Sequence, residues 1–95
     1  MNEKTIENYF IWAVASMGGR TYKFRSVSQR GVSDRVACLL DGSTWFVELK
    51  APNGRLSELQ KVFANEMKLL NQNYRLFSST KEIDEWKETW ELHNS

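Results

Sequence analysis

Three side chains near the middle of the chain have the types and spacing that divalent-metal chemistry requires. Glu48 and Lys50 lie two residues apart in an apolar, strand-like segment, so both side chains emerge on the same face of a strand. Asp34 begins the preceding segment, and a hairpin between the two segments brings Asp34 alongside the end of the second. We therefore expect two carboxylates and one ammonium group to converge at one edge of a sheet.

Such a group of side chains suits Mg²⁺, which proteins commonly hold with one or two carboxylates plus water and substrate phosphate. Asp34 and Glu48 supply the carboxylates, and the Leu49 carbonyl offers a further oxygen. The ion would polarise a phosphoryl oxygen and lower the pKa of bound water, while Lys50 would orient that water or offset charge on the pentavalent intermediate. The alternative is that Glu48 and Lys50 form a solvated salt bridge, worth about 0–1 kcal/mol.

The periodicity of apolar residues predicts the elements that position these groups. A helix is expected up to Gly18-Gly19, because its apolar residues recur at spacings of three and four. Alternation predicts strands at residues 21–25, 34–40, 44–50 and 74–78, and Asp41-Gly42 predicts a tight turn. Two further helices are expected at residues 57–71 and from Thr80 onward. The order αβββαβα predicts one α/β domain over residues 1–95, with a central mixed sheet flanked by helices.

The same periodicity predicts which side chains each helix buries. The three expected inner faces are, in chain order, Ile6, Tyr9, Phe10, Ala13, Val14 and Met17; then Leu59, Val62, Phe63, Met67 and Leu70; and finally Ile83, Trp86 and Trp90. The single cysteine, Cys38, lies in an apolar run and is expected to be a small core residue. The chain contains no apolar run of the roughly 20 residues needed to cross a bilayer, so an intracellular, cytoplasmic protein is expected.

Charge is distributed unevenly, although the net charge is only +1. Residues 20–35 carry five basic side chains and one acidic one, and the chain from Lys81 onward carries five acidic side chains and two lysines. A basic end and an acidic end suggest that a polyanion binds on one side of the molecule.

Taken together, these segments resemble the virus-type replication-repair nuclease (VRR-NUC) domains of the PD-(D/E)xK superfamily. The resemblance spans nearly the whole chain. The matching segments are Ile6-Glu7, Gly18-Gly19, Lys23-Phe24, residues 31–35 (Gly-Val-Ser-Asp-Arg), residues 45–52 (Trp-Phe-Val-Glu-Leu-Lys-Ala-Pro), residues 54–57 (Gly-Arg-Leu-Ser) and Gln60. The family usually has proline before the aspartate, where this chain has Ser33. That proline shapes the backbone, so the departure leaves the chemistry of the motif intact.

The resemblance implies a Mg²⁺-dependent DNA endonuclease, in which Mn²⁺ would substitute for Mg²⁺. It further implies selectivity for branched DNA, as in Holliday junction resolvases, and a phage- or prophage-encoded protein in a bacterial host. Glu7 would be a further acid near the metal, with Glu3 as the alternative. Gln60 would face the active site, although Ser57 and Gln60 also form a capping-box pattern at a helix start. The expected DNA-binding residues are Lys23, Arg25, Arg30, Arg35 and Arg55.

Two coordinated cuts require two active sites, so we expect a C2 homodimer, with Trp86 and Trp90 as the candidate contact if they do not fill the core. Two alternatives come from other classes of protein. One is a noncatalytic DNA-binding or accessory module in which Asp34, Glu48 and Lys50 form only a charge network. The other is an unrelated α/β interaction domain, which the basic segment disfavours.

Overall fold

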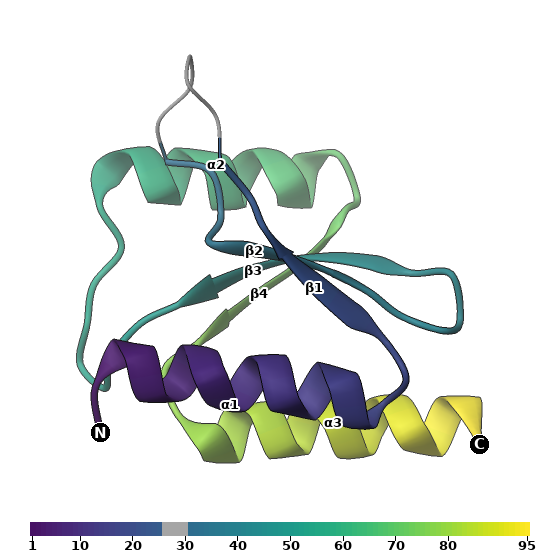
Figure 1. The fold of residues 1–95 in the computed structure, drawn as a ribbon. Helices are drawn as coiled ribbons and strands as arrows, with labels where there is room; N and C mark the ends of the chain where they lie inside the picture. Colours follow the sequence, from purple (N-terminus) through teal and green to yellow (C-terminus); the bar gives the residue numbers. More distant parts are fainter. Residues whose placement is uncertain (26–30) are drawn as a thin grey trace.

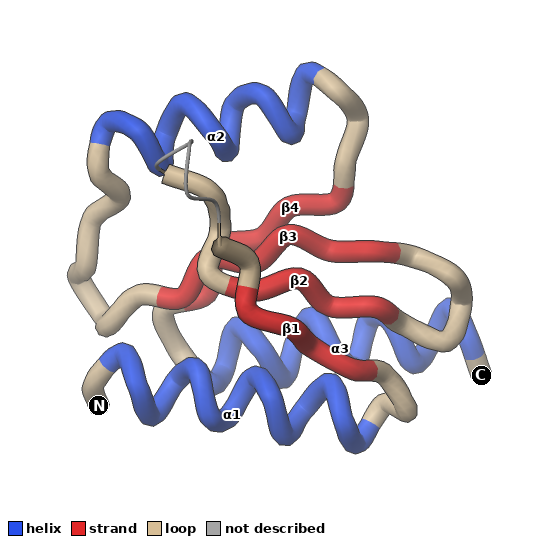
Figure 2. Tube along the Cα trace, turned by 45° about the horizontal axis from the view of Figure 1, so that its top comes forward, coloured by secondary structure: helices blue, strands red, loops and turns tan. Residues whose placement is uncertain are grey.

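The computed structural model describes residues 1–25 and 31–95, and it has the predicted order of elements. Three layers stack, with helices α1 and α3 on one face of a four-stranded sheet and helix α2 on the other (Figures 1 and 2). The predicted α/β class and the order αβββαβα are confirmed. The elements are α1 (Glu3–Ser16), β1 (Arg20–Lys23), β2 (Arg35–Cys38), β3 (Thr44–Leu49), α2 (Glu58–Leu69), β4 (Asn73–Phe77) and α3 (Thr80–Asn94).

The sheet is mixed and has the strand order β1-β2-β3-β4. Strands β1, β2 and β3 pair antiparallel, whereas β4 pairs parallel to β3. Parallel strands need a crossover connection, and α2 provides it between β3 and β4. No helix among the described residues is both long enough and apolar enough to cross a membrane.

The β2–β3 hairpin turns at the predicted Asp41-Gly42, but its loop is one residue longer than a two-residue turn. Leu39 and Ser43 are joined by a backbone hydrogen bond of 2.9 Å, and the Gly42 amide donates to the Leu39 carbonyl. Gly42 has a φ of +85°, which favours glycine over residues with a side chain. These features define a three-residue loop of the turn-plus-bulge kind. The loop fixes the register in which Arg35 lies opposite Val47.

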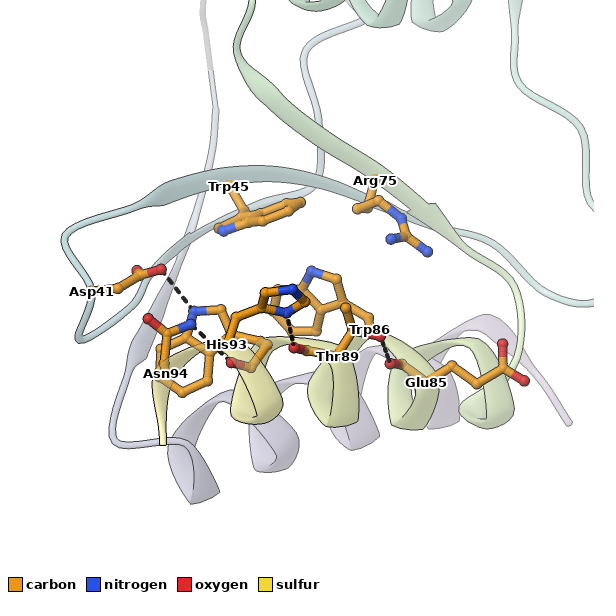
Figure 3. Close-up of a pocket in the computed structure, with 9 residues that line it drawn as sticks. Asp41, Trp45, Arg75, Glu85, Trp86, Thr89, His93 and Asn94 are labelled. Atoms are coloured by element: carbon orange, nitrogen blue, oxygen red, sulfur yellow. Dashed lines mark hydrogen bonds between the residues drawn. The ribbon is translucent and has the colours of Figure 1, made fainter.

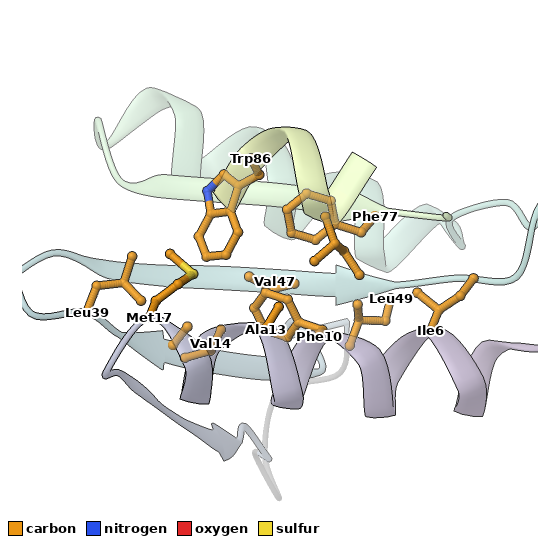
Figure 4. Packing of buried hydrophobic residues seen from close by; sticks show 12 residues of the cluster. Ile6, Phe10, Ala13, Val14, Met17, Leu39, Val47, Leu49, Phe77 and Trp86 are labelled. Atoms are coloured by element: carbon orange, nitrogen blue, oxygen red, sulfur yellow. The ribbon is translucent and has the colours of Figure 1, made fainter. Parts of the chain in front are cut away.

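The main core lies between the sheet and the α1/α3 layer (Figure 4). Phe10, Phe77 and Trp86 contact one another with ring centroids 5.5–5.7 Å apart, joining α1, β4 and α3. The inner faces predicted for the first and last helices are confirmed. The core residues contributed by α1 and α3 are Ile6, Phe10, Ala13, Val14, Ile83 and Trp86, with Tyr9 and Trp90 packed against them.

Helix α3 therefore does not present Trp86 to a partner, because only 4% of this side chain is exposed. Trp90 is half-buried, and its indole nitrogen donates a 3.0 Å hydrogen bond to Asp41 in the hairpin. Both tryptophans line a cavity of about 470 Å³ between α3 and the sheet (Figure 3). The expectation of a dimer contact through Trp86 is wrong, and the alternative that it fills the core is confirmed.

The inner face predicted for α2 is confirmed for Phe63 and Met67 and is wrong for Leu59, Val62 and Leu70. Phe63 is the one described α2 residue that is buried, whereas Leu59, Val62 and Leu70 are at least half exposed. The side facing the sheet instead carries Gln60, Phe63 and Met67, at spacings of three and four. On this side of the helix Gln60 makes a hydrogen bond to the sheet, as described below.

Cys38 is exposed and is not a core residue as predicted. Its register partners, Arg20 and Thr44, are also exposed and lie on the same face of the sheet. This face is the one on which α2 lies, and α2 packs mainly on β4 at the far edge. The β1–β2 half of this face is therefore left open.

Replacing Phe77 with alanine should destabilise the protein strongly. The side chain is fully buried and contacts the rings of Phe10 and Trp86, so its loss leaves a cavity costing about 3–5 kcal/mol. Urea unfolding measures the change. Leu92→Ala is the control, since 79% of Leu92 is exposed and its loss should change stability by less than about 0.5 kcal/mol. Equal effects of the two substitutions would contradict the assigned core.

Candidate functional site

Asp34 and Glu48 meet at the end of the β2–β3 pair, as their spacing predicted. Arg35 lies opposite Val47, which places Asp34, one residue earlier, opposite Glu48. One oxygen of the Asp34 carboxylate accepts a 2.9 Å hydrogen bond from the Leu49 amide. The Asp34 carbonyl also accepts from the Phe24 amide at 3.1 Å, which ties the start of β2 to β1. The position of the Asp34 carboxylate is therefore fixed from both neighbouring strands.

Ser33, which replaces the family's usual proline, is 1% exposed. Its hydroxyl lies 3.4 Å from the Arg35 carbonyl. The Ser33 side chain is thus buried just before β2, and the Asp34 carboxylate still accepts a hydrogen bond from the Leu49 amide.

Glu48 is a buried carboxylate with only 1% of its surface exposed. One of its oxygens accepts a 2.7 Å hydrogen bond from the Gln60 amide, and the same oxygen lies 3.9 Å from the Lys50 ammonium. Burial, and next the Asp34 carboxylate, raise the pKa of Glu48 to about 7, while Lys50 acts in the opposite direction. A solvated Glu48–Lys50 salt bridge does not describe this environment, because Glu48 is out of contact with water.

Gln60 performs both of the roles that the sequence left open. Its side-chain oxygen accepts from the Ser57 amide at 2.8 Å, which completes the capping box with Ser57 at the start of α2. Its side-chain nitrogen donates to Glu48. The two roles do not compete, because an amide offers an acceptor at one end and a donor at the other. Helix α2 is therefore attached to Glu48 through its first turn.

Glu7 points to a different partner from the one expected. Its carboxylate pairs with Arg35 at 3.1 Å and with Lys4 at 3.2 Å, and hydrogen bonds to these two cations hold its pKa below the usual range against the effect of burial. Glu3 is the first-helix acid that acts electrostatically on Glu48, and it raises the pKa of that carboxyl. Glu7 is therefore held by an ion pair to Arg35, the residue that follows Asp34 in the sequence.

The five expected DNA-binding residues differ in their exposure to solvent. Lys23, Arg25 and Arg55 are exposed. The Arg35 side chain is only 12% exposed, and its guanidinium binds Glu7 and the Thr21 hydroxyl, so it is not available to a phosphate. Arg30 lies outside the described residues.

Tyr74 lies beside the carboxylates, and nothing in the sequence had assigned it to the site. It pairs with Phe46 in the β3–β4 ladder, where Glu48 pairs with Leu76, so alternation puts Tyr74 and Glu48 on the same face. Burial, then the Glu48 and Asp34 charges, raise the pKa of Tyr74 to about 12. Only the parallel register reveals this neighbour, and the sequence does not give that register.

The donor chemistry of the site fits a hard divalent cation. Two carboxylates approach each other in a poorly hydrated place, where Lys50 compensates only in part, and a cation between them would relieve their repulsion. Asp34, Glu48 and the Leu49 carbonyl are the groups that would hold it. Within residues 1–25 and 31–95, no cluster of three or more His, Cys, Asp or Glu side chains is arranged to hold a metal. Backbone oxygen, water or substrate would therefore complete the coordination.

Known proteins resemble this chain in sequence and in fold. No family model matches the sequence. The chain is 36% identical over 78 residues to a protein named "Putative nuclease p44" of Acyrthosiphon pisum secondary endosymbiont phage 1, covering 82% of this chain and 74% of the relative. A solved structure described as a VRR_NUC domain superposes with a TM-score of 0.85 at 24% sequence identity, over 90% of this chain and 94% of the other.

The chain thus has the α/β fold of a VRR-NUC domain and, through its phage relative, a shared ancestry with a phage protein. It belongs to the same family as this phage relative. The resemblance to a phage-type VRR-NUC domain that the sequence motifs indicated is confirmed.

Glu48→Gln should stabilise the metal-free protein above neutral pH. Because the pKa of Glu48 in the folded protein is about 7, above the ordinary value of 4.5, folding disfavours the ionised carboxylate. The contribution of Glu48 to stability is therefore complete below pH 4.5 and is lost as the pH rises towards and through 7. We expect Glu48→Gln to raise the free energy of unfolding at pH 8 by on the order of 1–2 kcal/mol.

Urea unfolding at pH 5 and pH 8, in a chelator, measures this effect. Glu58→Gln is the matched control, since the Glu58 side chain is 90% exposed. A Glu48→Gln protein that loses stability equally at both pH values would contradict the assigned environment of Glu48.

Proposed function

We propose that this protein is a Mg²⁺-dependent DNA endonuclease that hydrolyses phosphodiester bonds at Asp34, Glu48 and Lys50. The observation that carries the proposal is the buried Glu48 carboxylate, which lies against Asp34 and within 3.9 Å of Lys50. Membership of the VRR-NUC family, and the name of the phage relative, support nuclease activity. The metal requirement and the endonucleolytic cut are inferred from the chemistry of these side chains.

Each residue contributes a separate part of the reaction. Asp34 and Glu48 would hold the metal ion, which would polarise a phosphoryl oxygen of the substrate and lower the pKa of a bound water. Gln60 holds the Glu48 carboxylate in place through its 2.7 Å hydrogen bond. Lys50 donates hydrogen bonds to the attacking water and offsets negative charge that develops on the phosphate.

The basic residues left exposed lie on segments that flank this site. Lys23 and Arg25 stand on either side of Phe24, whose amide bonds to the Asp34 carbonyl. Arg55 lies in the loop that leads from Lys50 to α2. Contacts from Arg25 and Arg55 to phosphates would hold DNA over the carboxylates. Lys23 pairs with Arg35 and therefore lies on the opposite face of the sheet. The acidic α3 lies in the layer on the other face of the sheet, away from that path (Figure 1).

The finer features of the activity follow from the family. We propose that the substrate is branched DNA, such as a flap or a four-way junction, and that Mn²⁺ supports the reaction as well as Mg²⁺. The protein would act in phage replication, recombination or repair in the cytoplasm of a bacterial host. A noncatalytic DNA-binding or accessory module is the alternative, and a cleavage assay distinguishes the two.

Lys50→Ala should abolish cleavage while leaving DNA binding nearly unchanged, because Lys50 acts on the reacting groups and one charge adds little affinity. The assay offers duplex, flap and four-way-junction DNA to the wild type in Mg²⁺, Mn²⁺ or EDTA. We expect cleavage with either metal, none in EDTA, and a rate at least about 100-fold lower in the variant. Binding is measured with Ca²⁺ in place of Mg²⁺.

Lys61→Ala is the matched control, since Lys61 is an exposed lysine paired only with Glu58 on α2. DNA binding without cleavage by the wild type in any of the metals would favour the noncatalytic module. Cleavage by Lys50→Ala at the wild-type rate would contradict the role of Lys50.

We propose in addition that two copies form a C2 dimer, since two strands of a junction require two cuts. With Trp86 in the core, we place the contact on the outer face of α2, one of the surfaces with exposed apolar side chains. Val62 and Leu69 lie there two turns apart, 54% and 76% exposed. Such exposed apolar residues on one helix are typical of an interface.

Light scattering at micromolar concentration should give a dimer for the wild type and a monomer for Val62→Asp. Leu92→Asp, at an exposed position of α3, is the matched control and should remain dimeric. A wild-type monomer that cuts both strands of a junction would contradict the dimer, and a dimeric Val62→Asp would place the interface elsewhere.

A further inference from the structure

We propose that Tyr74 is a further substrate-contacting residue of this site, whose phenolic O–H donates a hydrogen bond to a non-bridging oxygen of the DNA phosphate bound at Asp34 and Glu48. The inference rests on the proposed nuclease function. It adds to the site a neutral donor on the edge strand β4, which is outside the sequence motifs that define the family resemblance.

The position of Tyr74 in the sheet brings it next to Glu48. Strand β4 runs parallel to β3, with Tyr74 opposite Phe46 and Leu76 opposite Glu48. Tyr74 is therefore the diagonal neighbour of Glu48 on the same face, and an aromatic side chain spans that separation. Asp34 lies opposite Glu48 in the β2–β3 register, so Tyr74, Glu48 and Asp34 are all on this face of the sheet.

Packing against α2 fixes the ring of Tyr74. Phe63 of α2 meets Tyr74 edge-to-face, with centroids 6.3 Å apart, and Phe63 in turn packs edge-to-face on Phe46 at 5.9 Å. Gln60 lies one turn before Phe63 and bonds to Glu48. Two contacts between α2 and the sheet thus stand side by side, Gln60 on Glu48 and Phe63 on Tyr74. The tyrosine ring is held by the same helix that holds the carboxylate.

Within residues 1–25 and 31–95, no hydrogen bond joins the Tyr74 hydroxyl to another residue, and the side chain is only half-buried. Tyr9, by contrast, donates its hydroxyl proton to Asp84. A packed ring with an unpaired hydroxyl beside two carboxylates is a donor available to a ligand.

The Tyr74 hydroxyl suits a phosphate. A phosphodiester offers only acceptors, and Asp34 and Glu48 are themselves acceptors, so a neutral donor beside them complements the bound phosphate. A tyrosine phenol, with an ordinary pKa of about 10, is protonated at neutral pH. Tyr74 is consequently a donor and not a general base.

Tyr74→Phe tests this role, because it removes the O–H and keeps the ring that packs on Phe63. Single-turnover cleavage of the preferred DNA in Mg²⁺ should slow by about 10-fold, the effect of losing one hydrogen bond to a charged oxygen. The urea midpoint should be unchanged. Tyr22→Phe is the matched control, since Tyr22 lies on the same face of the sheet but on β1, at the opposite edge, and is 55% exposed.

The outcomes separate this inference from the proposed function. Cleavage by wild type and Tyr22→Phe at similar rates, with a slow but equally stable Tyr74→Phe, supports it. A Tyr74→Phe rate within about twofold of wild type overturns it while the nuclease stands. A slow Tyr74→Phe whose urea midpoint has fallen also overturns it, because the hydroxyl would then serve the fold. Failure of the wild type to cut any DNA overturns the nuclease proposal itself, and the role of Tyr74 with it.

Discussion

The arrangement of the groups around the site depends on the burial of the Glu48 carboxylate. Removing a carboxylate from water is costly unless hydrogen bonds and opposite charge compensate. Gln60 supplies a hydrogen bond of 2.7 Å, and Lys50 supplies a charge at 3.9 Å. Because Gln60 also completes the capping box with Ser57, the start of α2 is determined by the position of Glu48. On the same side of the helix Phe63 lies inward, whereas Val62 lies outward.

The two faces of the sheet have correspondingly different roles. The face under α1 and α3 carries the main core, in which Phe10, Phe77 and Trp86 join three elements. That core makes β3 a rigid platform, since the side chains of Val47 and Leu49 are buried in it on either side of Glu48 in the sequence. The opposite face is only partly covered by α2 and carries the polar groups. A precise site on a rigid strand keeps its geometry better than one built on loops.

How much of this the sequence determines depends on the range of the interactions. Helices α1 and α3 follow from local periodicity, and the hairpin follows from Asp41-Gly42, so the meeting of Asp34 with Glu48 could be predicted. The exposure of Leu59, Val62 and Leu70 could not, because the apolar pattern of α2 taken alone places these residues on the inner face. The pairing of Arg35 with Glu7 joins residues 28 positions apart, and the place of Tyr74 depends on a parallel register. Neither leaves a signal in local sequence.

The electrostatics of the site weigh against a purely structural explanation of its charges. A carboxylate placed beside Asp34, out of water, has its pKa raised to about 7, so at neutral pH the ionised pair opposes folding. An apolar residue at position 48 would avoid that opposition and could pack against Phe46 and Leu76. With Glu48 at this position, two carboxylates repel each other, and a bound cation would relieve that repulsion. The same field acts on Tyr74 and keeps it a donor. The same arrangement of charge thus underlies both the proposed metal site and the environment of the neighbouring phenol.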